Sequence, residues 1–178
     1  MVTASRIHDP LVYDPQPGRR EREVPRIAHL RLEPQLVRWT LDLDSGLATE
    51  ELLDDGLAEF PRVDDRRVGV ETHAAYLGAF DEHETLRFAG VRRVDLRSGA
   101  AIERRFGPGL SGGEVSVLPT GPGEHEALLA SFVTRDDGGP SELWLLDAQQ
   151  LETVARLRIP ARVPVGFHTR WIPGEALA

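Results

Sequence analysis

Apolar and polar residues alternate along most of this chain, in short runs separated by turn signals. The run Ile27-Ala28-His29-Leu30-Arg31-Leu32 alternates with a period of two, as a half-buried strand does. Similar runs continue to the C-terminus, with turn signals at residues 44–46, 97–99 and 136–140. The best helical candidate, residues 48–57, is acidic and short. The pattern therefore predicts an all-β fold.

The first 25 residues lack this alternation. Pro10, Pro15, Pro17 and Gly18 precede the charged run Arg19-Arg20-Glu21-Arg22. Segments with many prolines and no apolar periodicity seldom form regular elements. We therefore expect residues 1–25 to be a flexible lead-in and residues 26–178 to form one domain.

Three predicted hairpins recur at a regular interval. Each has an apolar residue and then an aspartate at the end of one strand, followed by a turn and a second strand. The aspartates Asp42, Asp95 and Asp147 are separated by 53 and 52 residues. A period of about 50 residues built from four short strands is typical of a β-propeller blade. A β-sandwich is the alternative, but it does not require so regular a repeat.

The length of the chain limits the number of blades. About three units of this size fit between residue 27 and the C-terminus, whereas a closed propeller has at least about four blades. We therefore predict a partial β-propeller. Blades that do not close expose faces and strand edges, which favours self-association or a second polypeptide that supplies the missing blades.

The phase of the repeat selects three residues. In a propeller the strand that opens each blade runs along the central axis, so residues at equal phase converge on one axial point. The strands after the three hairpins contain Glu59, Glu114 and His168, which are 55 and 54 residues apart. We therefore predict that two carboxylates and one imidazole face the same channel.

Each of these residues also has a simpler interpretation when it is taken alone. Glu59 would be a surface partner of Arg62 or Arg66, and Glu114 would face solvent beside a glycine-rich loop. His168 would be a hydrogen-bonded residue of a strand over residues 163–171. The common spacing is what favours a shared site.

The chemistry of such a site is that of a metal ligand backed by acids. An imidazole that binds a metal through one nitrogen usually donates its other N–H to an acceptor such as a carboxylate. One histidine cannot hold a metal, because iron and zinc sites take three or four protein ligands. The remaining histidines fall at other phases and are predicted to be surface or structural residues: His8, His29, His73, His83 and His125.

Composition narrows the classes of partner and site. The chain is 40% hydrophobic and 28% charged, as soluble globular proteins are, and its net charge of −8 argues against nucleic-acid binding. It has no cysteine, which excludes disulfides, thiolate metal sites and cysteine nucleophiles. No apolar run approaches the roughly 18 residues of a membrane span, and no signal peptide is evident, so we expect a cytoplasmic protein.

Two enzyme motifs are matched by coincidence. Residues 107–112 satisfy G-x-G-x-x-G and residues 109–113 satisfy G-x-S-x-G. Both motifs work only when a helix follows, whereas a strand is predicted after residue 113. We interpret the segment as a loop between blades. Trp39, Trp144 and Trp171 lie in predicted strands and are expected to pack in the core.

Several stretches resemble one enzyme family. They are Glu59-Phe60-Pro61-Arg62-Val63-Asp64, Gly113-Glu114 with the strand after it, and Val163-Pro164-Val165-Gly166-Phe167-His168. These look like the C-terminal motifs of the carotenoid cleavage oxygenases, which include the retinal-pigment-epithelium isomerase and bacterial stilbene cleavers. Arg38-Trp39-Thr40-Leu41-Asp42 fits the same family. The chain departs from it at Thr169, where the family usually has glycine.

This resemblance implies a seven-bladed propeller with Fe(II) on its axis, held by four histidines of which three are backed by glutamates. His168 would be the last iron ligand, and Glu59 and Glu114 would be two of the backing glutamates. The implied reaction splits a conjugated C=C bond of a carotenoid, apocarotenoid or stilbene with O2 into two carbonyls.

Three of the four ligand histidines would lie in blades that this chain lacks, so we expect it to be inactive alone. The expected partners are an apolar polyene or stilbene substrate, O2 and a second polypeptide or a second copy. We also expect peripheral contact with a membrane, and we expect no nucleic-acid partner. The alternative function is a non-catalytic β-propeller module that serves as a binding or scaffold unit.

Overall fold

The computed structural model describes residues 2–7, 33–80 and 87–174. Strands make up nearly all of the regular structure in these ranges, together with the short 3-10 helix η2 (Asp65–Arg67). The strands are β1 (Val2–Ile7), β2 (Pro34–Leu41), β3 (Ala48–Asp54), β4 (Ala58–Arg62), β5 (Ala74–Phe80), β6 (Phe88–Asp95), β7 (Ala101–Arg105), β8 (Leu110–Ser111), β9 (Ser116–Pro119), β10 (Ala127–Arg135), β11 (Glu142–Asp147) and β12 (Thr153–Arg158). The predicted all-β fold is confirmed.

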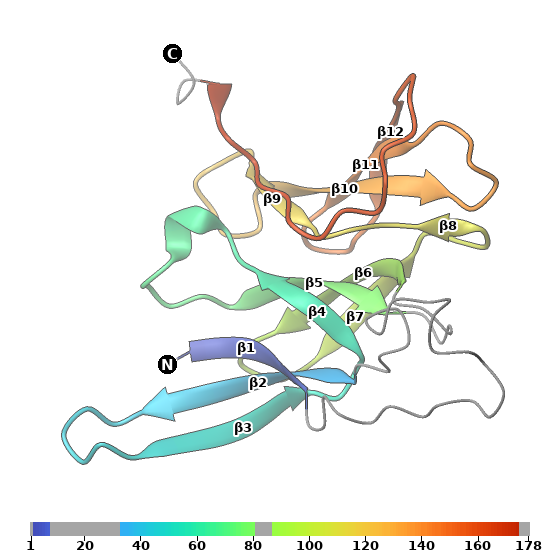
Figure 1. The fold of residues 1–178 in the computed structure, drawn as a ribbon. Helices are drawn as coiled ribbons and strands as arrows, with labels where there is room; N and C mark the ends of the chain where they lie inside the picture. The colour runs from blue at the N-terminus through green and yellow to red at the C-terminus, as the bar shows by residue number, and fades with distance from the viewer. Residues whose placement is uncertain (1, 8–32, 81–86, 175–178) are drawn as a thin grey trace, which may run out of the picture.

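The strands form three antiparallel sheets that follow one another along the chain. The first has the order β1-β2-β3 and the second β4-β5-β6-β7. The third has the order β12-β11-β10. Strand β10 also pairs with β8 and with β9, which lie along the same edge of β10 and are separated by an interruption. Figure 1 shows the sheets stacked in layers, with the first sheet at one end and the third at the other.

Two apolar clusters lie between the layers. The first joins Leu36 and Leu53 of the first sheet to Leu77 and Val94 of the second. The second cluster contains Tyr76 and Val91 of the second sheet, and it also contains side chains of the third, including Leu129, Trp144 and Leu146. Each sheet therefore buries its apolar side chains against its neighbour, as blades do.

The three predicted hairpins are present and share one turn. In each, Oδ1 of the aspartate accepts the backbone N–H groups two and three positions later, at 2.7 to 3.3 Å. The residue four positions after each aspartate has positive φ: Gly46 at 72°, Gly99 at 73° and Leu151 at 59°. Leucine is strained there, and Leu151 is only 1% exposed, so burial of its side chain offsets that strain.

The N-terminal third differs in two places from what the sequence suggested, at the helical candidate over residues 48–57 and in the lead-in. Residues 48–54 form strand β3 rather than a helix, because pairing with β2 along its whole length outweighs a weak helical signal. Within the expected lead-in, Val2–Ile7 forms strand β1, which pairs with β2 in register from Val2 opposite Trp39 to Ile7 opposite Pro34. The rest of the lead-in and the expected strand at residues 27–32 lie outside the described residues.

The C-terminal run also differs from its prediction. Residues 163–171 are not a strand, and none of the strands in the described ranges pairs with them. Trp144 is buried at 1% exposure, as expected, but Trp171 is 46% exposed. The described part of the chain contains no helix with the length and apolarity needed to cross a membrane.

Candidate functional site

The C-terminal segment, residues 159–174, passes between the second and third sheets (Figure 1). Ser141 holds the first part of this segment. Its hydroxyl donates to the Val163 carbonyl at 3.1 Å and accepts the Val163 N–H at 2.9 Å. Further along, Thr169 contacts Arg62 of β4 on one side and Ser116 of β9 on the other. The segment therefore brings His168 to the junction of two sheets.

Glu114 lies in the interruption between β8 and β9, and not in a strand as predicted. Its side chain is only 4% exposed. The two preceding glycines allow close packing at this point. A Cβ on Gly112 would lie 2.3 Å from the Phe106 ring, and one on Gly113 would lie 2.9 Å from the carbonyl oxygen of Gly166.

These glycines explain why the glycine-rich motifs matched here. A phosphate-binding or nucleophile-bearing turn needs a helix after it, whereas this segment contains strand β8 and the interruption that follows it. The interpretation of residues 107–113 as a loop between blades is only partly right, because Leu110–Ser111 form strand β8, which pairs with β10.

The structure brings Glu114 and His168 together. Oε2 of Glu114 lies 3.6 Å from Nδ1 of His168. The imidazole is 80% exposed at its side chain, whereas the carboxylate is buried. With Nδ1 turned toward an acid, Nε2 is the nitrogen through which this histidine would bind a metal.

Glu59 adjoins this pair through Phe60. The Phe60 ring lies 5.2 Å from the His168 ring and 6.1 Å from that of Phe167, measured between centroids. Phe60 has φ of 58°, which is rare for a bulky residue. Its N–H donates to Oε2 of Glu59 at 2.9 Å. Among the described contacts, the Glu59 carboxylate reaches neither Glu114 nor His168.

Arg62 is a site residue that the sequence interpretation assigned to another partner. The simpler interpretation of Glu59 pairs Arg62 with it on the surface, but the Nε of Arg62 forms an ion pair with Oε1 of Glu114 at 2.7 Å. Arg66, the other expected partner of Glu59, instead pairs with Asp64 at 2.6 Å. Glu114 therefore does not face solvent. Its charge is balanced by Arg62.

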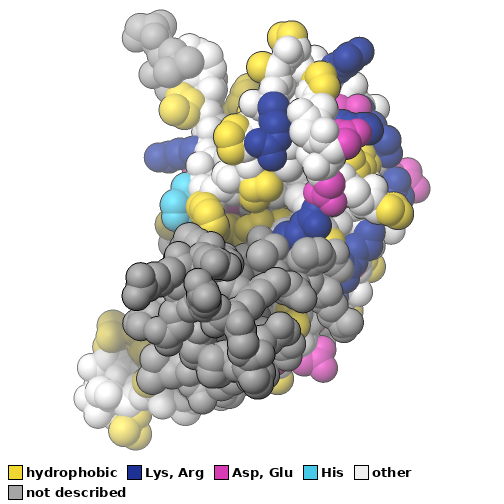
Figure 2. Space-filling view, turned by 45° about the vertical axis from the view of Figure 1, so that its right-hand side comes forward, with side chains coloured by type: hydrophobic (Ala, Val, Ile, Leu, Met, Phe, Trp, Pro, Cys, Tyr) yellow, Lys and Arg dark blue, Asp and Glu magenta, His cyan; other side chains and the backbone are white. Residues whose placement is uncertain are grey.

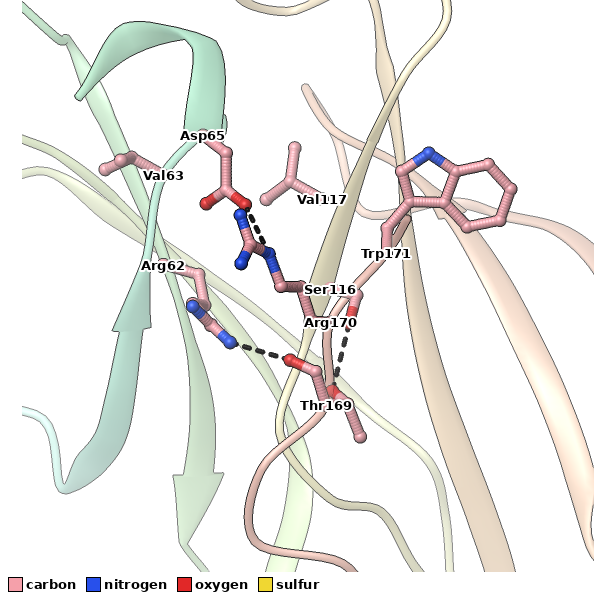
Figure 3. Close-up of a pocket in the computed structure, with 8 residues that line it drawn as sticks. All are labelled: Arg62, Val63, Asp65, Ser116, Val117, Thr169, Arg170 and Trp171. Carbon is pink, nitrogen blue, oxygen red and sulfur yellow. Dashed lines mark hydrogen bonds and ion pairs between the residues drawn. The ribbon is translucent and has the colours of Figure 1, made fainter. Parts of the chain in front are cut away.

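A small pocket borders this arrangement, as Figure 3 shows. It is lined by Arg62, Val63, Asp65, Ser116, Val117, Thr169, Arg170 and Trp171. Its two arginines are already paired, since Arg170 Nε lies 3.3 Å from Asp65 Oδ2. The pocket therefore offers no unpaired cation for an anionic ligand.

The two other histidines in the described part of the chain, His73 and His125, have no described contact with this site. Nδ1 of His73 lies 2.9 Å from Oε2 of Glu124, in a contact between the second sheet and the loop before β10. His125 is in the same loop. His8, His29 and His83 lie outside the described ranges. Within those ranges, no group of three or more histidine, aspartate or glutamate side chains is placed to hold a metal ion.

One known protein family matches nearly the whole chain. The family described as retinal pigment epithelial membrane protein matches residues 1–173. The carotenoid cleavage oxygenase of Mycobacterium tuberculosis is 34% identical over 148 residues, which are 79% of this chain and 29% of that protein. The apocarotenoid-15,15'-oxygenase of Synechocystis is 32% identical over 147 residues, which are 79% of this chain and 30% of that protein.

Solved structures give the same result. The cobalt-substituted apocarotenoid oxygenase of Synechocystis has a TM-score of 0.70 at 30% identity, over 80% of this chain and 30% of that one. A chimera of that enzyme with the retinal pigment epithelial protein has a TM-score of 0.72 at 27% identity. The partial propeller is thereby confirmed over the sandwich, and the chain spans about 30% of the length of these relatives.

Proposed function

The chain belongs to the carotenoid cleavage oxygenase family, and we propose that it supplies the C-terminal blades of such an oxygenase. The substrate would be a carotenoid, an apocarotenoid or a stilbene. Its conjugated C=C bond would be cleaved by O2, with one oxygen atom going to each carbon to give two carbonyls. The observation that carries this proposal is the exposed imidazole of His168 beside the buried carboxylate of Glu114.

The proposed cofactor is Fe(II), with His168 as one of its ligands. An imidazole with one nitrogen turned toward a carboxylate fits that role. Iron held by neutral histidines would supply open positions for O2 and the alkene. The described residues bring a single imidazole to this place, so the other ligands would have to come from outside them.

Glu59 is proposed as an acid behind a ligand that another blade supplies. It lies on β4 directly before Phe60, the residue whose ring packs against His168. Its carboxylate accepts the N–H of Phe60 through Oε2. A carboxylate has further acceptor capacity beyond one such bond.

The proposed partner is the set of blades that the relatives have and the matched region does not cover. Large apolar side chains are open to solvent beside His168, where Phe167 is 53%, Trp171 46% and Ile172 48% exposed. Figure 2 shows hydrophobic side chains exposed on one face of the molecule. Further blades packed on this side would bury such side chains and complete the ligand set.

The direct test joins this chain to the N-terminal part of a relative. The chain would be fused to the portion of the Synechocystis apocarotenoid-15,15'-oxygenase that precedes the matched region, and incubated with an apocarotenoid under 18O2. The expected result is two labelled carbonyl products from the fusion and none from the isolated chain. A folded fusion that neither binds iron nor cleaves the substrate would favour the non-catalytic module, and turnover by the isolated chain would refute the need for further blades.

A further inference from the structure

Two charged side chains hold the backbone of Thr169 from opposite sides, and we propose that Arg62 positions His168 by this means. The Thr169 N–H donates to Oε2 of Glu114 at 2.6 Å, and the Thr169 carbonyl accepts from Nη2 of Arg62 at 2.6 Å. The ion pair between Arg62 and Glu114 closes the arrangement. The role given to His168 rests on the proposed function, but these contacts do not.

This clamp, formed by Arg62, Glu114 and Thr169, holds the segment where backbone hydrogen bonds to a neighbouring strand would otherwise hold it. Residues 159–173 pair with no strand in the described part of the chain, so ordinary backbone hydrogen bonds do not fix the segment near His168. Hydrogen bonds to ionised groups are stronger than neutral ones. The guanidinium group carries several donors in a fixed plane, so one arginine can bind a carboxylate and a carbonyl together. Figure 3 shows Arg62 reaching Thr169 across the pocket.

The side chain of Thr169 adds to the same attachment. Its hydroxyl accepts from Ser116 Oγ at 3.0 Å and lies 3.3 Å from the carbonyl oxygen of Glu114, to which it donates. Only Phe60 and Leu151 have positive φ among the described non-glycine residues, so position 169 does not need glycine's conformational freedom. The Thr169 hydroxyl thus fixes this position with hydrogen bonds that glycine, which has no side chain, could not make.

The close approach of the backbone makes the clamp sensitive to small shifts. The carbonyl of Gly166 lies against Gly113 with no room for a Cβ between them. Glu114 is nearly fully buried, and a buried carboxylate without its counter-charge is costly. Loss of Arg62 would therefore leave the Glu114 charge uncompensated and free the Thr169 carbonyl at the same time, so the neighbouring His168 would lose its fixed position.

The test uses the isolated chain without metal and reads the segment directly by NMR. The first readout is hydrogen exchange of the Thr169 amide. The second is the nuclear Overhauser contact between the rings of His168 and Phe60, whose centroids are 5.2 Å apart. Arg62→Gln should speed exchange about tenfold or more and remove the ring contact, because a charge-assisted attachment is lost.

Two further variants make the result specific. Arg62→Lys keeps the positive charge but loses the planar set of guanidinium donors. It should therefore retain the ring contact only in part and give an intermediate exchange rate. Arg170→Gln is the matched control, because Arg170 lies beside Thr169 but pairs with Asp65 instead, and both readouts should stay unchanged. Thermal unfolding of each variant separates a local release from global loss of the fold.

The proposal is overturned if Arg62→Gln remains folded and keeps both the slow exchange and the ring contact. It is also overturned if Arg62→Gln and Arg62→Lys both unfold, because Arg62 would then serve the whole fold rather than His168. If only Arg62→Gln unfolds, the same two readouts are taken from Arg62→Lys. Exchange as slow as in the wild type together with a full ring contact in that variant would overturn the proposal. None of these measurements needs iron, so a failed cleavage assay would count against the proposed function and leave this result standing.

Discussion

The carboxylate of Glu114 and the imidazole of His168 lie 3.6 Å apart, although 54 residues separate them in the chain. Glu114 lies in the interruption between β8 and β9 of the third sheet, and His168 lies in the segment that follows the same sheet. A repeat that returns the chain to the same place every fifty or so residues brings them together. The pair is thus a product of the blade period.

The contact between Gly113 and Gly166 gives the first prediction. Gly113→Ala should lower the free energy of unfolding by about 1–3 kcal/mol, because its Cβ would lie 2.9 Å from the Gly166 carbonyl and displace the segment. Gly166→Ala is the matched control, since a Cβ there meets nothing within 4 Å and should change stability by less than about 0.5 kcal/mol. Urea unfolding measures both. Equal effects of the two substitutions would show that the approach is not tight.

The shared hairpin turn gives the second prediction. Gly46 and Gly99 have nearly the same positive φ, so an alanine at either costs about 1 kcal/mol of backbone strain. Only Gly99 is also crowded, with the Leu53 carbonyl oxygen 2.6 Å from its added Cβ. Gly99→Ala should therefore lower the unfolding midpoint further than Gly46→Ala does. An equal or larger loss for Gly46→Ala would contradict the crowding of Gly99 against the Leu53 carbonyl.

Glu124 gives a prediction about pH. Burial raises the pKa of this carboxyl, but hydrogen bonds from the N–H groups of His73 and Ala74 outweigh it and leave the pKa below 4.5. A depressed pKa contributes stability that is full above about pH 4.5 and is lost as pH falls through the folded-state value. Glu124→Gln should therefore be less stable than the wild type at pH 7, and the gap should shrink below pH 4.5.

Urea unfolding from pH 3 to 7 measures that gap, with the exposed Glu152→Gln as the control variant. A difference between the wild type and Glu124→Gln that stays constant over this range would mean that its ionisation does not support the contact between the second and third sheets. The control should show no comparable change with pH.

The parts of the fold that were predictable are those that depend on local chemistry. Asp42, Asp95 and Asp147 each bond to backbone two and three positions away, so a short stretch of sequence contains the whole turn. Their even spacing then indicated the blades. Strand β1 was not predictable in this way, because its residues become a strand only by pairing with β2, more than twenty-five residues later.

The candidate site was predictable to a similar extent. Equal phase indicated Glu59, Glu114 and His168, and the structure brings Glu114 and His168 together, whereas the Glu59 carboxylate bonds to the Phe60 N–H. Equal phase gave no information on Arg62, whose partner Glu114 comes from another sheet and whose nearer acid, Glu59, bonds to the Phe60 N–H instead. The Glu-Phe-Pro-Arg motif did contain Arg62, but its role depends on how the C-terminal segment docks.

The most direct measurement of the central claim is the iron content of the fusion with the N-terminal part of the Synechocystis relative. We predict about one iron per molecule for the wild type and for Arg170→Gln, and none for His168→Ala, because that substitution removes a proposed ligand while leaving the buried Glu114 and Arg62 paired. A His168→Ala fusion that stays folded and binds as much iron as the wild type would contradict the account.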